Sequence, residues 1–316
     1  MDTNVNPCED FAKFACGNFY RTATYREGKT SVSPFSILND ANNKLIESIV
    51  SDEEMPSDWM YVKYMKRLYK SCMDEDVIEQ LGLTPYLKSS RSKEWPTLIG
   101  RNWSGEANFD LSEVNAAYMS EGLQPLFTIQ VALDPLDSST NILALMDPDL
   151  SYEVFRKART SPRVLAYEEI LRDLATQLGA DAQVASEDTK AVIDLQSALS
   201  KTVIPRKERK RNISSQLNMF TLGALRDRYK FVDIPKAVRA VFATANITIE
   251  DTQKVLVPFP QVLDKISTIV ENTSSRTLQN LFGFGHAYAQ TKGLTKRMRE
   301  NSLPLEKVTK YFCFDR

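Results

Sequence analysis

A chain of 316 residues is long enough to bury a substantial core, in one large domain or two modest ones. Its composition, 42% hydrophobic and 26% charged, is that of an ordinary globular protein and excludes wholesale disorder. The net charge of -1 gives no general reason to expect binding to nucleic acid or to an anionic membrane surface. No apolar run approaches the roughly 20 residues of a membrane-spanning helix. Met1 is followed at once by polar residues, so we expect neither a signal peptide nor an anchor in this chain.

The first patterned stretch is residues 7–18, PCEDFAKFACGN. Phe11, Phe14 and Ala15 fall at positions i, i+3 and i+4, on one face of a helix. Gly17 follows these residues and is a plausible C-cap. The sequence therefore predicts a short amphipathic helix at the start of the chain.

Two of the four cysteines, Cys8 and Cys16, lie in this stretch. In a continuous helix they would be two turns apart, about 12 Å at the usual rise per residue. A disulfide cannot span that distance. Each of the two must find a partner elsewhere or stay free.

Apolar residues at helical spacing continue downstream and predict a mainly α fold. A first segment covers residues 38–49. A second helix, with Ser57 as its cap, would bury one face. The residues of that face are Val62, Met65, Leu68, Tyr69 and Cys72. Asp110 and Glu113 form a capping-box-like start for a third helix through Met119.

The pattern changes to strict alternation of apolar residues between residues 126 and 133. Turn-forming residues occupy positions 134–141, and a short apolar run follows at 142–145. This combination predicts a β-hairpin. The predicted fold class is therefore mainly α, a multi-helix domain with a small β-hairpin.

The clearest helix of the second half begins at Ser161 and Pro162, with cap and first-turn proline in their preferred positions, and ends at Gly179. Other helices are expected near residues 192–199, 222–229, 236–243, 262–270 and 278–290, and a strand near 254–257. A basic run at residues 206–211 could be read as a nucleic-acid or nuclear-targeting patch. Without interleaved aromatic residues or overall basicity, we expect a solvated loop and no nucleic-acid partner.

Several motifs occur in a fixed order along the chain. The most specific is the opening one, Met1 and Asp2 followed by PCEDF at 7–11 and FACGN at 14–18. The later ones are RLYKSC at 67–72, Trp95-Pro96 with Trp103, Asn218 with Thr221-Leu222, LVPFPQVL at 256–263 and TLQNL at 277–281. Together they resemble the N-terminal, largely helical part of the M13 zinc metallopeptidases, the neprilysin and endothelin-converting-enzyme family.

This resemblance implies that residues 1–316 form one M13 N-terminal-type domain. It also implies that residues 1–40 pack on a C-terminal catalytic domain that this chain does not contain. In the family a cytosolic tail, a membrane anchor and a stalk precede this point. We therefore expect an extracellular location, either secreted or as the ectodomain of a type II membrane protein.

The family cleaves peptides with a zinc ion held by two histidines of a His-Glu-x-x-His helix and a distant glutamate. This chain has a single histidine, His286 in the sequence GHAY at 285–288, which we expect to be structural. It also contains no Gly-x-Ser-x-Gly elbow, phosphate loop or Cys/His nucleophile pair. We expect no cofactor and no peptide hydrolysis from this chain alone, and zinc only in a full-length family enzyme.

In neprilysin an arginine of this region grips the carboxylate of the substrate, a task suited to guanidinium. An ungapped alignment places that arginine at Ser31 and a neighbouring one at Asn39. The resemblance then favours an endopeptidase-type specificity, or none, and leaves the substrate-binding residues unknown.

By resemblance, Cys72 pairs with Cys313, and Cys8 and Cys16 pair with cysteines of the C-terminal catalytic domain. The Cys72–Cys313 bridge would close a loop of about 240 residues, worth on the order of 5 kcal/mol in the chain-entropy model. Four unpaired cysteines in a cytosolic protein remain the alternative. Candidate N-glycosylation sites compatible with secretory passage are Asn102, Asn212, Asn246 and Asn272.

Two functions remain open. The first is the non-catalytic N-terminal portion of a neprilysin-like zinc metalloendopeptidase, which covers the catalytic domain and limits the access of peptide substrates. Its partners would be that domain, in cis, and peptides. The second is a stand-alone, catalytically inactive secreted paralogue that binds peptides or acts as a decoy.

Overall fold

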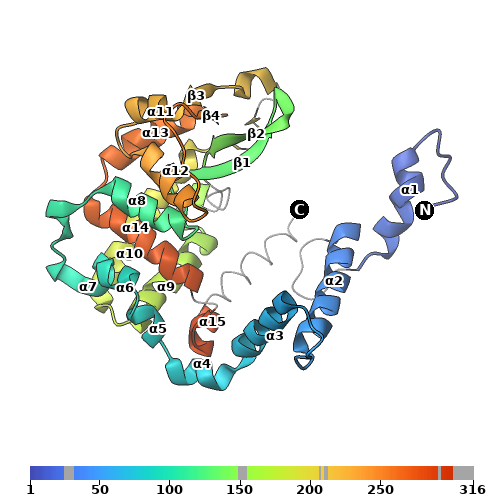
Figure 1. Ribbon diagram of the computed structural model, residues 1–316, viewed down its shortest axis with the longest axis horizontal. Helices are drawn as coiled ribbons and strands as arrows, with labels where there is room; N and C mark the ends of the chain where they lie inside the picture. The colour runs from blue at the N-terminus through green and yellow to red at the C-terminus, as the bar shows by residue number, and fades with distance from the viewer. Residues whose placement is uncertain (25–31, 149–154, 206–207, 210–212, 291–292, 302–316) are drawn as a thin grey trace. The chain divides into compact units, whose positions relative to one another are not determined.

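The computed structural model describes residues 1–24, 32–148, 155–205, 208–209, 213–290 and 293–301 (Figure 1). The chain divides into two compact units, the first containing Met1–Ile78 and the second Glu79–Ser302. Helix α4 (Glu75–Leu81) spans the boundary between them. Ser31, Asn212, Cys313 and most of the basic run at 206–211 lie outside the described residues.

The described part of the first unit consists of α1 (Phe11–Thr22), α2 (Pro34–Ser51) and α3 (Met60–Met73). Asp10 caps α1 by accepting a hydrogen bond from the Lys13 N–H. Ser33 and Ser36 form a capping box at the start of α2. These caps satisfy amide groups that have no partner inside their own helices.

The N-terminal residues fold back over α1, and their close approach explains why α1 contains a glycine at position 17. The Asp2 N–H donates to the Phe14 carbonyl at 2.6 Å, and the Asp2 carboxylate pairs with Arg21 at 3.0 Å. A Cβ at position 17 would lie only 3.1 Å from the Asp2 Cβ. Gly17 therefore permits this close approach. The prediction that Gly17 ends the helix was wrong, because α1 continues to Thr22.

The first unit has almost no apolar core of its own. Within residues 1–24 and 32–78 the buried residues are Asp2, Gly17, Val50 and Lys66. On α3, three residues predicted to be buried are exposed: Met65 by 46%, Leu68 by 66%, and Cys72. That prediction was wrong because no described part of the unit covers this face of the helix.

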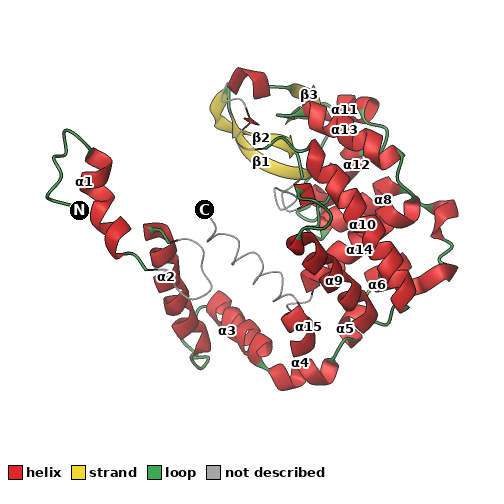
Figure 2. Cartoon of the chain, turned by 180° about the vertical axis from the view of Figure 1, so that it is seen from behind, coloured by secondary structure: helices red, strands yellow, loops and turns green. Residues whose placement is uncertain are grey.

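The second unit is a helical bundle with a small sheet at one end (Figure 2). Its described helices are α5 (Thr84–Leu87), α6 (Ser90–Glu94), α7 (Pro96–Ile99), α8 (Leu111–Ser120), α9 (Pro162–Gln177), α10 (Ala182–Thr202), α11 (Leu222–Arg228), α12 (Ile234–Ala243), α13 (Pro260–Glu271), α14 (Ser275–Gln290) and α15 (Lys296–Asn301). The prediction of a mainly α fold with a small β part is confirmed.

The sheet contains the predicted hairpin and two further strands. Strands β1 (Thr128–Asp134) and β2 (Asp137–Met146) pair antiparallel. Strand β4 (Lys254–Leu256) pairs parallel with β2 and antiparallel with β3 (Met219–Thr221), giving the order β1-β2-β4-β3. The sequence did not predict β3, because three residues are too few to show an alternating pattern.

Helix α14 runs through the middle of the bundle and packs against α6, α7, α8, α9 and α10 (Figure 1). It contacts Trp95, the tryptophan of the Trp-Pro motif, which is fully buried. The Trp95 ring meets Phe284 edge to face, with centroids 4.8 Å apart. A Cβ at Gly283 would lie 2.3 Å from Trp95 Cδ1, so only glycine fits beneath the indole.

A buried polar network joins α7, α10 and α14. The Arg276 guanidinium donates to both Asp188 carboxylate oxygens, at 2.9 and 2.7 Å, and to the Gly100 carbonyl at 3.0 Å. The Thr97 hydroxyl bridges the Asp188 carboxylate and the Asn280 side-chain oxygen, at 3.0 and 2.8 Å. A bidentate guanidinium pair of this kind fixes the orientation of the helices as well as holding them together.

We expect Gly283→Ala to destabilise the protein by about 2–3 kcal/mol, because the new methyl group overlaps the Trp95 ring and the core must shift. Gly285→Ala is the matched control on the same helix. Its Cβ would meet only the end of the flexible Leu123 side chain, at 3.3 Å. Its effect should stay within about 1 kcal/mol. Urea unfolding measures both, and equal losses would contradict this role of Gly283.

We expect Arg276→Met to cost about 3 kcal/mol, because it leaves the Asp188 carboxylate buried without its cation. Arg101→Met is the control, since it breaks the neighbouring but exposed pair with Glu187 and should cost about 1 kcal/mol or less. Thermal and urea unfolding of the two variants provide the comparison. Similar losses from both would show that burial of the Asp188 pair is unimportant.

Candidate functional site

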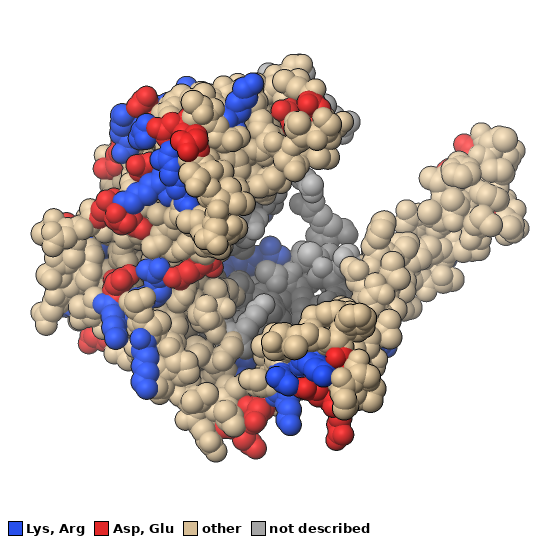
Figure 3. All heavy atoms as spheres, in the orientation of Figure 1, with Lys and Arg blue, Asp and Glu red and all other residues tan. Residues whose placement is uncertain are grey.

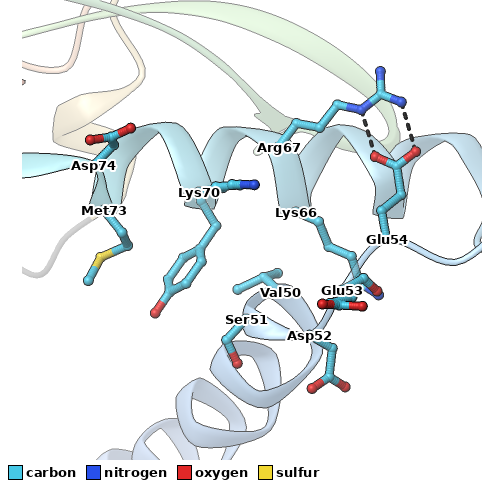
Figure 4. A pocket seen from close by; sticks show the side chains of 11 residues that line it. Val50, Ser51, Asp52, Glu53, Glu54, Lys66, Arg67, Lys70, Met73 and Asp74 are labelled. Atoms are coloured by element: carbon cyan, nitrogen blue, oxygen red, sulfur yellow. Dashed lines mark hydrogen bonds and ion pairs between the residues drawn. The ribbon is translucent and has the colours of Figure 1, made fainter. Parts of the chain in front are cut away.

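A charged cavity of about 800 Å³ lies in the first unit, between the end of α2 and one face of α3 (Figure 4). Its charged lining residues are Asp52, Glu53, Glu54, Lys66, Arg67, Lys70 and Asp74. Val50, Tyr69 and Met73 supply apolar and aromatic surface. The cavity therefore offers ionic and apolar contacts side by side.

Lys66 anchors the loop that forms one wall of this cavity. Its side chain is 7% exposed, and its ammonium group donates to the Glu53 carbonyl at 2.8 Å and to Asp58 Oδ2 at 2.9 Å. The Asp58 carboxylate accepts hydrogen bonds from the Met55 N–H and from Lys66. Both bonds lower the pKa of Asp58, the one from Met55 by more. The buried lysine thus ties the α2–α3 loop to α3.

A second ion pair joins the same loop to α3 at the cavity lining. The Arg67 guanidinium donates to both Glu54 oxygens, each at 2.7 Å, and Figure 4 shows the two parallel bonds. The hydrogen bonds from Arg67 lower the pKa of the Glu54 carboxyl. Among the described residues, Lys70 and Asp52 on the lining have no ion-pair partner. The arrangement suits binding of a polar or charged group and supplies no nucleophile with an adjacent base.

Asn39 lines a separate cavity of about 680 Å³ between α1 and α2. Its neighbours on that wall include Asp40 and Asn43. This wall therefore presents amide and carboxylate groups where the resemblance placed an arginine. Ser31, the other aligned position, lies outside the described residues.

His286 lies in an aromatic cluster of the second unit. Its ring is 5.7 Å from that of Tyr86 and 5.8 Å from that of Tyr118, between centroids. Its Nε2 is 3.7 Å from Glu121, which itself pairs with Arg91 at 2.6 Å. Burial lowers the pKa of His286, while the Glu121 charge acts in the opposite direction.

Three buried polar atoms of this cluster have no hydrogen-bond partner among the described residues. They are the hydroxyls of Tyr86 and Tyr118 and the Nδ1 of His286. Burial raises the pKa of both tyrosine hydroxyls, so both are neutral at physiological pH. The cluster is a tightly packed aromatic core with one weakly basic group inside it.

The residues present do not fit the catalytic zinc site of metallopeptidases. The sequence has one histidine, whereas that site needs two on one helix. In the parts of the chain that the structure describes, no three His, Cys, Asp or Glu side chains gather closely enough to hold a metal ion.

Cys8, Cys16 and Cys72 are exposed free thiols in the structure. Cys8 precedes α1, where its N–H donates to the Asn6 side chain, so the two-turn spacing inferred for Cys8 and Cys16 does not apply. Cys313 lies outside the described residues, and its pairing with Cys72 stays a prediction.

Three of the glycosylation candidates, Asn102, Asn246 and Asn272, are exposed in the second unit. Asn246 has a positive φ of 57°, and Asn272 ends α13. Asn212 lies outside the described residues.

Sequence reasoning missed the groups that build these sites. Lys66 and Asp58 are eight residues apart, and Asp188 and Arg276 are far apart in the chain, so no local spacing identifies either pair. Tyr86 lies on α5 and Tyr118 on α8, whereas His286 lies on α14. Only the GHAY context of the histidine pointed toward an aromatic environment.

The sequence matches the family model of Peptidase family M13 over residues 7–311. Neprilysin of Mus musculus is 26% identical over an alignment 331 residues long, gaps included. The alignment covers 95% of this chain and 42% of that protein. Neprilysin-2 of Drosophila melanogaster is 24% identical over 285 residues, covering 89% of this chain and 37% of that protein. This chain therefore spans about two fifths of the length of these relatives.

Solved structures share the fold. The zinc metalloprotease ZMP1 of Mycobacterium tuberculosis, in complex with an inhibitor, superposes with a TM-score of 0.72 at 16% identity, covering 98% of this chain and 46% of that one. PEPO of Lactobacillus rhamnosis superposes with a TM-score of 0.70 at 16% identity, covering 97% of this chain and 47% of that one.

The lowered pKa of His286 predicts an acid-sensitive stability. In the unfolded chain His286 has the ordinary pKa of a histidine, 6.5, whereas in the folded chain its pKa is lower. The free energy of unfolding should therefore be full above pH 6.5 and fall as the pH drops through the lower, folded pKa. We expect His286→Phe to flatten this loss, measured by urea unfolding between about pH 7.5 and about pH 5.

Glu121→Gln serves as the second arm, because it removes the charge that favours protonated His286. It should deepen the loss of stability on acidification. Parallel pH profiles for the wild type and His286→Phe would show that His286 does not control this range.

Proposed function

This chain belongs to peptidase family M13, and on that premise we propose that it is the N-terminal, non-catalytic portion of a neprilysin-like zinc metallopeptidase. In this proposal a C-terminal catalytic domain holds the zinc ion and cleaves peptides. The present chain covers that domain and limits which peptides reach it. Without the catalytic domain the chain does not hydrolyse peptides.

The observation that carries the proposal is the exposed apolar face of the first unit. We call it the α2–α3 face, and its residues are Leu38, Leu45, Ile46 and Ile49 on α2 and Tyr61, Tyr64, Met65 and Leu68 on α3. Leu45 is 60% exposed and Leu68 is 66% exposed. Large exposed apolar surfaces on soluble proteins usually mark interaction sites. A C-terminal catalytic domain in the same protein is the partner that the length of the relatives supports.

The cysteines fit the same arrangement. Cys8 lies just before α1 and Cys16 within it, and both are exposed, so a partner domain packed there can reach both thiols. We propose that both form disulfides with that domain and that Cys72 pairs with Cys313. Disulfides persist in oxidising compartments, which supports an extracellular location. The exposed sequons at Asn102, Asn246 and Asn272 support the same location.

We expect the protein from its native source to extend well beyond Arg316, with Cys8 and Cys16 bridged to the extension. Intact mass with and without reduction, followed by disulfide mapping, tests this directly. A native chain that ends at Arg316, with Cys8 and Cys16 free or intermolecular, would overturn the proposal. It would favour the stand-alone, peptide-binding paralogue.

We further expect the double change Leu45→Lys and Leu68→Lys in the full-length protein to lower the yield of assembled, peptide-cleaving enzyme tenfold or more, because it buries two unpaired charges. Leu165→Lys is the control. Leu165 is a leucine of the second unit, 49% exposed on α9, outside the α2–α3 face. Equal activity of the double variant and the control would show that this face contacts no catalytic domain.

A further inference from the structure

Strand β1 forms one edge of the four-stranded sheet, since the order is β1-β2-β4-β3. Within the hairpin, Ile129 lies opposite Leu145, Val131 opposite Leu143 and Leu133 opposite Asn141. An edge strand presents one row of backbone groups that its own sheet does not use. The direction of those groups on β1 can be read from one hydrogen bond.

The Ile129 N–H donates to the Gln124 side-chain oxygen at 2.8 Å, so it points away from β2. In an antiparallel pair, alternate residues direct their N–H and C=O groups to the same side. The backbone groups of Val131 and Leu133 therefore also point away from β2. No described residue outside the ladder hydrogen-bonds to them through its backbone.

Within the described residues, this edge lacks the usual protection against pairing. Edge strands are normally blunted by lysine, proline or a bulge. The β1 sequence, TIQVALD, contains neither lysine nor proline, and the irregularity in register comes only at its end, between Leu133 and Asp134. The outward backbone groups of Val131 and Leu133 are therefore open for pairing.

Two of the exposed side chains along this edge are apolar. Val131 is 59% exposed and Leu133 is 66% exposed, and both lie on the same face of the sheet as Ile129, which packs on the core. Leu136, in the connecting turn, is 70% exposed. A strand added here would therefore meet apolar side chains at alternating positions.

The end of the hairpin is acidic. Asp134 and Asp137 are the charged residues of positions 128–146, which contain no lysine or arginine. Figure 3 shows acidic side chains gathered at the end of the hairpin. Hydrogen bonds from the Ser139 hydroxyl and N–H lower the pKa of the Asp137 carboxyl, which keeps it ionised.

We propose that the outer edge of β1 binds an extended peptide as an added antiparallel strand. Its apolar side chains lie beside Val131 and Leu133, and a basic residue at its N-terminal end lies near Asp134 and Asp137. Main-chain hydrogen bonds supply affinity and the alternating side chains supply specificity, as in other cases of strand addition. That the peptide is a substrate segment rests on the proposed function, but the binding itself requires no catalytic domain.

A second copy of this chain fits the edge less well. Stable protein interfaces bury about 1,000 Å² or more in total. A seven-residue strand with only part of its edge open offers far less than a folded partner needs. A flexible peptide, in contrast, can follow the strand alone.

The probe is an N-acetylated, fluorescein-labelled heptapeptide of lysine followed by alternating valine and threonine, titrated with the full 316-residue chain in anisotropy measurements. Two N-methylated versions carry methyl groups on alternate amides, one set on each edge of the extended peptide. Strand addition uses a single edge, so one version should bind like the parent. The other should bind at least about tenfold more weakly, because it loses its hydrogen bonds and meets a steric clash. Equal binding of the two versions would overturn the proposal.

On the protein side, Val131→Pro removes the outward N–H without removing a hydrogen bond to β2, as proline on a sheet edge allows. We expect about tenfold weaker binding of the parent peptide. Val131→Thr keeps the N–H and the branched shape and should change binding by less than about threefold. Unchanged binding by Val131→Pro would contradict the proposal, and so would a dimer of this chain that Val131→Pro abolishes.

No part of this test reads peptide cleavage. Failure of strand addition would leave the proposed M13 function standing. Conversely, a native chain that ends at Arg316 would leave the peptide titration just as informative.

Discussion

The bidentate pair between Arg276 and Asp188 is the constraint on which the second unit depends. It joins α10 to α14, and Thr97 and Asn280 extend the same network to α7. A guanidinium fork accepts only a narrow range of carboxylate orientations, so the pair fixes the angle at which these helices cross. The Trp95 indole beside Gly283 then fills the space that this geometry leaves.

The two units solve the problem of burial differently. The second buries a continuous apolar cluster drawn from its helices and its sheet. The first buries almost nothing within its described residues and presents the α2–α3 face to its surroundings. Its internal order comes instead from helix caps, from Asp2 folded over α1 and from the Lys66–Asp58 pair. Such a unit gains stability when another surface covers it.

The role that we propose for this chain is one of binding. Many of its ionic groups are engaged in pairs such as Arg67–Glu54, and its one histidine lies within an aromatic core. What it offers to other molecules is surface: an apolar helix face, a charged cavity and an open strand edge. This division suits a domain that selects or holds peptides while a zinc-bearing domain cleaves them.

The sequence by itself determined the family, the mainly α fold, the hairpin and the starts of helices such as α8 and α9, because these depend on local spacing, caps and ordered motifs. It also determined that one histidine cannot form the family's zinc site. It misjudged Gly17, Met65 and Leu68, because whether a residue is buried depends on what packs against it. The Asp188–Arg276 pair, the aromatic cluster of His286 and the open edge of β1 were decided only by the tertiary structure. The pair and the cluster are contacts between residues that are distant in the chain, and the open edge is a place where no such contact forms. Helical or strand periodicity carries no information about contacts of this kind.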